Sequence, residues 1–154
     1  MGVGARRARC RLVDGEPRDV VADEAAVSWL EGRPPWSADY LAPDGSEIRL
    51  LGAGDGGSVA HCPLAPGSTS TPVRHGNVDE IWFVTGGHGM LWRQPPGDED
   101  DIVSLRYGVC ADIEPGQVFQ FRSTGIEPLT SLLLTMPPWP GSQEAEPMSQ
   151  GRWV

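Results

Sequence analysis

Eight short segments, each six to nine residues long, fill most of the sequence from Glu47 onward and restrict the possible folds more than any other feature. Most are rich in β-branched, aromatic or leucine residues, which favour strands. Clusters of Gly, Pro, Ser and Asp separate them, as turns require. This pattern predicts an all-β sandwich or barrel. The segments are EIRLLG (47–52), SVAHCPL (58–64), EIWFVTG (80–86), GMLWRQ (89–94), DIVSLRYG (101–108), CADIEPG (110–116), VFQFRS (118–123) and PLTSLLLTM (128–136).

Composition excludes several classes of function. The net charge of −9 argues against a nucleic-acid partner. All 12 basic residues are Arg, so no lysine can act as a Schiff-base nucleophile. No apolar run approaches the roughly 18 residues of a membrane span, and the N-terminus lacks a signal-peptide core. We therefore expect a cytoplasmic protein without a membrane partner, whose three cysteines are free thiols.

The two ends of the chain differ from the strand-rich middle. We expect residues 1–44 to form an N-terminal tail with one short helix at Asp23–Leu30, packed on a barrel formed by residues 45–154. The C-terminal segment after Met136 is rich in Pro and Trp, and we expect it to be irregular. Its Trp139 and Trp153 should anchor it against the barrel wall, because exposed Trp is disfavoured.

Glycines recur at fixed spacing in two stretches, and the first also contains a His and a Glu. In the first, Gly67 is followed by Val73, His75, Glu80 and Gly87. In the second, Gly108 is followed by Glu114, Gly116, Phe119 and Ser123. These stretches resemble the two motifs of the cupin superfamily, GxxxxxHxH-x(3,4)-E-x(6)-G and GxxxxxPxGxxHxxxN. The resemblance covers about residues 45–141 and implies a cupin-type jelly-roll β-barrel with a site in its interior, often in a dimer.

The departures from the motifs bear on the metal that most cupins hold with three His and one Glu. Val73 and Phe119 occupy two of the His positions, and neither side chain can coordinate a cation. Only His75 and Glu80 remain, fewer than the three protein ligands that open catalytic sites usually keep. We therefore expect no metal cofactor.

An alternative metal site stays open. If His61 faced the interior, then His61, His75 and Glu80 would form a set that suits Fe(II) or Zn. The loop between residues 61 and 75 breaks the strand alternation, so the opposite phase, with Cys62 inward, is equally possible. His88 lies between glycines in a turn, and we expect it to be exposed to solvent.

Strand alternation predicts which side chains line the interior. Taking Glu80 as inward turns Asp79 outward, and Arg122 also points outward. The expected interior is apolar and aromatic with a few polar groups, as in a small-molecule pocket. We expect substrate contacts from Thr71, Val73, Trp82, Phe119, Phe121 and Ser123.

His75 and Glu80 are the expected catalytic pair. A His titrates near neutrality and can take and return a proton, and a Glu in an apolar barrel can have a raised pKa and act as the acid. This chemistry drives cyclisation, isomerisation or dehydration of a hydrophobic metabolite. Resemblance to cyclase cupins implies a role in natural-product biosynthesis of the polyketide type.

Two other interpretations remain open. One is an Fe(II)- or Zn-dependent enzyme of the oxygenase type, and the other is a non-catalytic ligand-binding protein. Edge strands in a small barrel and the Trp-rich end favour a homodimer in each case.

Overall fold

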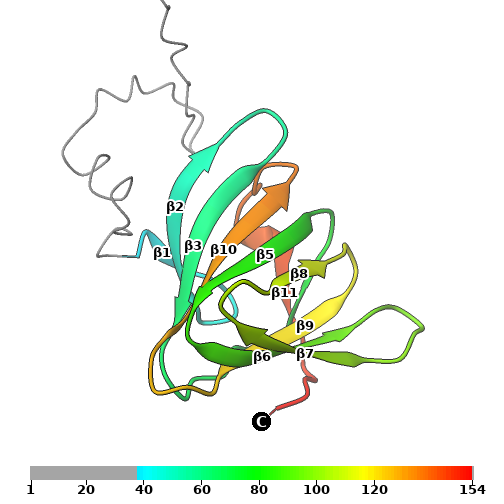
Figure 1. The fold of residues 1–154 in the computed structure, drawn as a ribbon. Helices are drawn as coiled ribbons and strands as arrows, with labels where there is room; N and C mark the ends of the chain where they lie inside the picture. Colours follow the sequence, from blue (N-terminus) through cyan, green and yellow to red (C-terminus); the bar gives the residue numbers. More distant parts are fainter. Residues whose placement is uncertain (1–37, 154) are drawn as a thin grey trace, which may run out of the picture.

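The computed structural model describes residues 38–153, which form two antiparallel β-sheets packed face to face (Figure 1). The predicted N-terminal helix at Asp23–Leu30 lies outside the described residues. One sheet has the order β1 (Tyr40–Leu41), β2 (Glu47–Ala53), β3 (Ser58–Leu64), β10 (Leu129–Met136), β5 (Asp79–Gly86), β8 (Cys110–Ile113). The other has the order β11 (Ala145–Pro147), β4 (Val73–His75), β9 (Val118–Ser123), β6 (His88–Gln94), β7 (Asp101–Arg106). The predicted all-β jelly-roll barrel is confirmed.

The observed strands coincide with the eight segments expected from the sequence to within two or three residues at their ends. β10 is central to the larger sheet, because it pairs with β3 on one side and with β5 on the other. Its alternating burial places Leu129, Ser131, Leu133 and Thr135 inside. β1 lies before the expected start of the barrel at residue 45, and it lengthens the sheet by pairing with β2.

The core lies between the two sheets, and its largest fully buried side chains are aromatic: Trp82, Phe119 and Phe121. Gly87, which matches the last glycine of the first motif, connects β5 to β6 with φ = +73°. A Cβ at this position would lie 2.2 Å from the carbonyl oxygen of Pro128. Because both the backbone angle and the space exclude a side chain, the turn requires glycine.

The C-terminal segment is more regular than expected. It contains a 3₁₀ turn, Ser142–Glu144, followed by the short strand β11, which pairs with β4. The sequence predicted no strand here, because the segment is rich in Pro and has no alternating strand pattern. β11 is only three residues long, and its pairing with β4 defines it rather than its own sequence. The described chain therefore adds its last strand next to His75.

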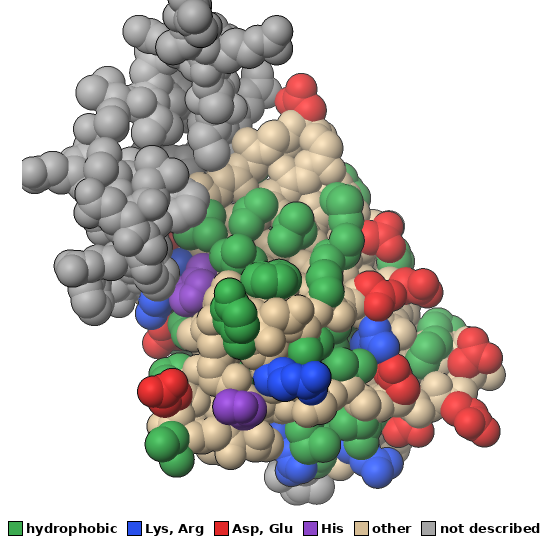
Figure 2. All heavy atoms as spheres, in the orientation of Figure 1, with side chains coloured by type: hydrophobic (Ala, Val, Ile, Leu, Met, Phe, Trp, Pro, Cys, Tyr) green, Lys and Arg blue, Asp and Glu red, His purple; other side chains and the backbone are tan. Residues whose placement is uncertain are grey.

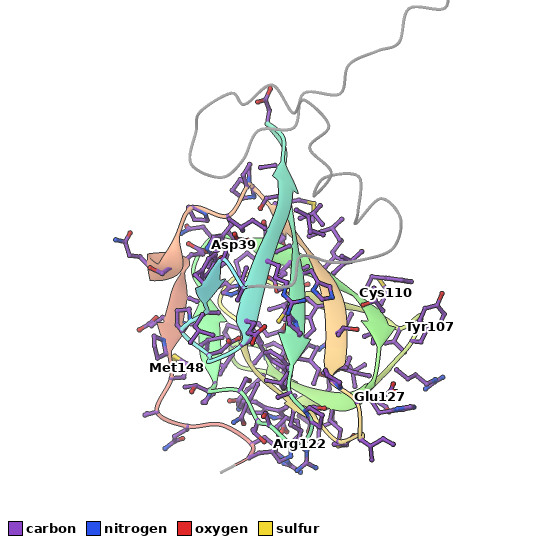
Figure 3. The ribbon with its side chains drawn as sticks, turned by 90° about the vertical axis from the view of Figure 1, so that its left-hand side faces the viewer. Asp39, Tyr107, Cys110, Arg122, Glu127 and Met148 are labelled. Atoms are coloured by element: carbon purple, nitrogen blue, oxygen red, sulfur yellow. The ribbon has the colours of Figure 1, made fainter. Side chains whose placement is uncertain are left out.

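Two anchors hold this segment to the barrel. The backbone N–H of Trp153 donates to Gln120 Oε1, and the Gln120 amide donates to the Trp153 carbonyl, both at 2.9 Å. The Arg122 guanidinium lies 4.6 Å from the Trp153 ring centroid, a cation–π contact. Figure 3 shows Arg122 at the lower rim of the barrel, near the C-terminal segment, which agrees with its predicted outward orientation. The expected anchoring role of Trp153 is confirmed.

The outer face of the larger sheet is partly apolar (Figure 2). Phe83, Leu134 and Met136 from β5 and β10 are each between one third and two fifths exposed. The remaining labelled side chains of Figure 3 include Tyr107 and Cys110, which lie at the outer edge of the fold.

The expected homodimer and cytoplasmic location stay predictions. Within residues 38–153 no helix has the length and apolar content needed to span a membrane.

Glu144 fastens the C-terminal segment to the turn between β4 and β5. Its carboxylate accepts hydrogen bonds from the backbone N–H groups of Asn77 and Val78 and from the Asn77 amide. Burial works to raise the pKa of Glu144, but these hydrogen bonds outweigh it and lower the pKa. The turn that follows His75 is thus held by a buried carboxylate.

We expect Glu144→Ala to lower the free energy of unfolding by about 1–3 kcal/mol, because it leaves the buried N–H of Val78 and the part-buried N–H of Asn77 without an acceptor. Urea unfolding measures this. The control is Glu146→Ala, which removes an exposed ion pair with Arg74 and should cost less than about 1 kcal/mol. Equal effects of the two substitutions would contradict the anchoring role of Glu144.

Candidate functional site

A cavity inside the barrel contains both residues of the expected catalytic pair. It is lined by side chains of both sheets and has about 50 Å³ of space open to the centres of water-sized molecules. An apolar cavity of about 150 Å³ can hold one benzene molecule, so this cavity suits a smaller compound. The sequence predicted these lining residues: Val73, His75, Glu80, Trp82, Phe119 and Phe121.

Strand alternation brings these residues together as expected. In β5, Glu80, Trp82 and Val84 are buried, whereas Asp79 and Phe83 are exposed. In the smaller sheet, Val73 of β4 pairs directly with Phe119 of β9. Two of the three positions at which the cupin motifs have His are therefore opposite each other and form an apolar wall.

Glu80 is buried against an aromatic partner. Its side chain is 4% exposed, and its Oε1 accepts a hydrogen bond from Trp82 Nε1. Burial raises the pKa of Glu80 to about 8, although the Trp82 hydrogen bond works in the opposite direction. Near neutral pH most of this carboxyl group is protonated, so it can donate a proton.

His75 lies beside Glu80 in an equally buried position. Its Nδ1 is 3.7 Å from Glu80 Oε2, too far for a hydrogen bond, and has no other partner. The ring packs edge-on against Phe119 and Trp139, with centroids at 5.0 and 5.1 Å. Burial lowers the pKa of His75 to about 4, although the charge of Glu144 works to raise it. The imidazole is therefore neutral near pH 7 and can accept a proton.

The opposite pKa shifts of Glu80 and His75 determine the charge state of the pair. Between about pH 4 and pH 8 both groups are uncharged, so the contact is not an ion pair despite its short distance. Each group is in the form in which it can act, His75 as base and Glu80 as acid. An atom of a small molecule placed in the cavity would lie close to both.

The described residues do not fit the metal that the fold family implies. Within residues 38–153 no three His, Cys, Asp or Glu side chains are grouped so that they could hold an ion. His61, which the alternative metal site needs, does not line the cavity, whereas its neighbour Cys62 does. The strand phase is thus the one that turns Cys62 inward, and the structure brings together His75 and Glu80 but not His61. Because the donor set is incomplete, we derive no step through a metal.

Two other expected contacts lie away from the cavity. Thr71 is exposed. Ser123 is 3% exposed and shares a face with Phe119 and Phe121, but it lies beyond them along β9 and does not reach the lining. His88 is exposed, as expected for its position between two glycines.

Several lining residues were not expected from the sequence. Asp44 and Ser46 belong to the turn between β1 and β2, and a Pro-Asp-Gly-Ser sequence predicts a turn without telling where its side chains point. Tyr40 also lines the cavity, and burial raises its pKa to about 12. Trp139 was expected to anchor the C-terminal segment. It does so through its backbone N–H, which donates to Ser58 Oγ at 2.9 Å, and its ring also covers His75.

Comparison with known proteins identifies the fold. No protein-family model matches the chain, and no curated protein matches it. Among solved structures, the capsular polysaccharide assembling protein CapF from Staphylococcus aureus aligns with a TM-score of 0.55 at 17% identity, over 62% of this chain and 29% of CapF. An uncharacterised Klebsiella pneumoniae protein with a double-stranded β-helix domain has a TM-score of 0.53 at 22% identity, over 67% of this chain and 88% of its own. The Drosophila melanogaster CENP-C cupin domain has a TM-score of 0.56 at 14% identity, over 73% of this chain and 93% of its own.

The protein therefore has the cupin fold, a double-stranded β-helix, as the motif spacing predicted. The chain matches less than a third of the length of CapF. At these identities the likeness concerns the fold, and what the site does depends on its own residues.

The pH dependence of stability tests the protonation state of Glu80. A folded-state pKa near 8, raised from about 4.5, means that the folded protein binds more protons than the unfolded chain between these values. The stability contributed by the protonated carboxyl is fully present below about pH 4.5 and is lost as the pH rises through about 8. Glu80→Gln removes the titration but keeps an oxygen acceptor for Trp82.

We therefore expect the stability of Glu80→Gln relative to wild type to increase by a few kcal/mol between pH 5 and pH 9. Urea unfolding at several pH values measures this difference, and the exposed Asp79→Asn serves as control. A difference between Glu80→Gln and wild type that does not change with pH would show that Glu80 titrates at its ordinary value.

Proposed function

We propose that the protein is an enzyme that transfers protons on a small, largely apolar molecule held in the barrel, with Glu80 as acid and His75 as base. The observation that carries this proposal is the adjacent neutral pair, 3.7 Å apart, in a cavity with aromatic walls. Groups with such displaced pKa values, lying together in a cavity, are typical of acid–base sites. Structural hydrogen-bonded pairs usually satisfy their polar atoms, whereas His75 Nδ1 has no partner.

Proton abstraction next to a carbonyl group is the reaction that suits this pair. Neutral His75 takes a proton from the carbon, and Glu80 gives its proton to the carbonyl oxygen, which forms an enol. The His75 imidazolium then returns a proton to a different carbon, or assists the departure of a hydroxyl group as water. The Glu80 carboxylate takes back the enol proton, so both groups regain their initial states. Positioned acid–base groups typically contribute about 10²–10⁴-fold to such rates.

The size of the cavity favours a small substrate. A cavity of about 50 Å³ suits isomerisation or dehydration of a compact compound better than cyclisation of a long chain. The walls are provided mainly by Trp82, Phe119, Phe121 and Leu133. The proposal therefore keeps a hydrophobic metabolite as substrate and a role in natural-product biosynthesis, but it limits the substrate to a compact molecule.

The alternative functions make different demands on the same cavity. An Fe(II)- or Zn-dependent reaction is the weaker proposal, because it needs ligands beyond His75 and Glu80. A non-catalytic binding protein needs the cavity but has no use for an acid and a base beside each other. Exchange of substrate protons with solvent distinguishes catalysis from binding.

We expect the wild-type protein to incorporate deuterium from D₂O into members of a library of small ketones, aldehydes and esters. Mass spectrometry measures the incorporation. His75→Gln and Glu80→Gln should each slow it by about 10²-fold or more, because each removes one proton-transfer group. Asp79→Asn, an exposed neighbour of Glu80, should leave it unchanged. Full exchange in both site variants, with folding intact, would exclude the proposed roles.

A further inference from the structure

A second carboxyl group, Asp44, lines the cavity and has no role in the proposed proton transfer. It lies in the turn between β1 and β2, and its side chain faces the same space as Glu80. The residue is 9% exposed. Its Oδ1 accepts hydrogen bonds from the backbone N–H and the hydroxyl of Ser46, at 2.8 and 2.6 Å. No other described residue donates a hydrogen bond to Oδ2.

The two carboxyl groups of the cavity differ in their surroundings. Burial raises the pKa of Asp44, and the two hydrogen bonds from Ser46 counteract the rise. Two hydrogen bonds to Asp44 favour its charged form, whereas Glu80 accepts only one, from Trp82. A cation placed in the cavity would favour the ionised form of a carboxyl group, and the hydrogen bonds from Ser46 make Asp44 the better supported of the two.

The lining provides no positive charge to balance Asp44. None of the lining residues within the described part of the chain is an arginine, and the chain has no lysine. His75 is neutral near pH 7. Among residues 38–153 no ion pair involves Asp44. A buried carboxylate without a cation is costly, and a positively charged ligand would remove that cost.

Two further features point to a ligand with a positive end and an apolar body. The aromatic rings of Trp82, Phe119, Phe121 and Trp139 line the same space, and aromatic faces attract organic cations. His75 Nδ1 is an unpartnered polar atom on a side chain that is 5% exposed, and it faces the cavity beside Glu80. An occupant is therefore expected to reach both the carboxylate and this nitrogen.

We propose that the cavity binds a small organic cation, such as a primary amine, whose ammonium group is held by Asp44 while its apolar part lies against the aromatic walls beside His75 and Glu80. The inference deepens the proposed function, because it assigns a substrate class to the same cavity. Asp44 is then a specificity-determining residue, and the reacting carbon lies at the opposite part of the ligand.

The contacts between Asp44 and Ser46 also stabilise the turn, so a test must separate charge from turn geometry. Asn has the same shape and its Oδ1 can accept the same two hydrogen bonds, since Asn and Asp both favour such turns. Asp44→Asn therefore removes the charge and keeps the turn. Thermal unfolding of the variant shows whether the fold is retained.

Three matched probes measure the preference for charge: butylamine, butanol and butyrate, with propylamine, propanol and propionate as a smaller set. Titration calorimetry or tryptophan fluorescence gives the affinities near pH 7. We expect an amine to bind at least about tenfold more tightly than its alcohol, and the carboxylate to bind least, because a hydrogen bond to a charged group exceeds a neutral one by about that factor. Asp44→Asn should abolish the preference, and Asp79→Asn should keep it.

An alcohol that binds as well as its amine, or failure of both amines to bind, would overturn the inference; this comparison needs only the wild-type protein. A preference that persists in Asp44→Asn would also overturn it. Zinc chloride is titrated as a separate probe, and tight binding of Zn²⁺ without binding of amines would assign the cavity to a metal ion instead. The outcome of the deuterium experiment is independent of this one. If the protein prefers amines but incorporates no deuterium, the proposed function is refuted and the cation-binding inference still holds.

Discussion

A carboxyl group buried without a positive partner is the feature on which the site depends. Glu80 begins the run of inward residues in β5, and the aromatic residues around it exclude water from its side chain. In many barrels such a group would be neutralised by a cation or a metal. Here Val73 and Phe119, opposite each other on β4 and β9, leave too few ligands among the described residues to hold a metal. The carboxyl is neutral because it keeps its proton, and this makes it an acid.

The same exclusion of water acts on His75 in the opposite direction. Burial disfavours the charged form of both groups, so it raises the pKa of Glu80 and lowers that of His75. One physical cause therefore produces both an acid and a base. Asp44 differs because the two hydrogen bonds from Ser46 support its charged form. The cavity thus combines a neutral pair for proton transfer with a separate carboxyl group, Asp44, which we propose recognises a positively charged ligand.

The fold was predictable because it depends on local patterns. Alternating segments and turn residues located eight strands, and the spacing of Gly67, His75, Glu80 and Gly87 indicated the jelly roll. The inward residues of β5 and β9 followed from a period of two within each strand. The loop between residues 61 and 75 interrupts this period. The sequence therefore could not tell whether His61 or Cys62 faces the interior, and the structure was needed to decide. Asp44 and Trp139 come from a turn and from a C-terminal segment, and their positions depend on packing between distant parts of the chain.

The most direct measurement of the central claim is the titration of the Glu80 side chain itself. Carbon-13 NMR of the glutamate carboxyl carbons follows each group with pH, and Glu80→Gln identifies the signal of Glu80 by its loss. The account predicts a midpoint near pH 8, as expected from the burial of the group. A midpoint near 4.5, the ordinary value for Glu, would mean that Glu80 is ionised at neutral pH and cannot be the acid.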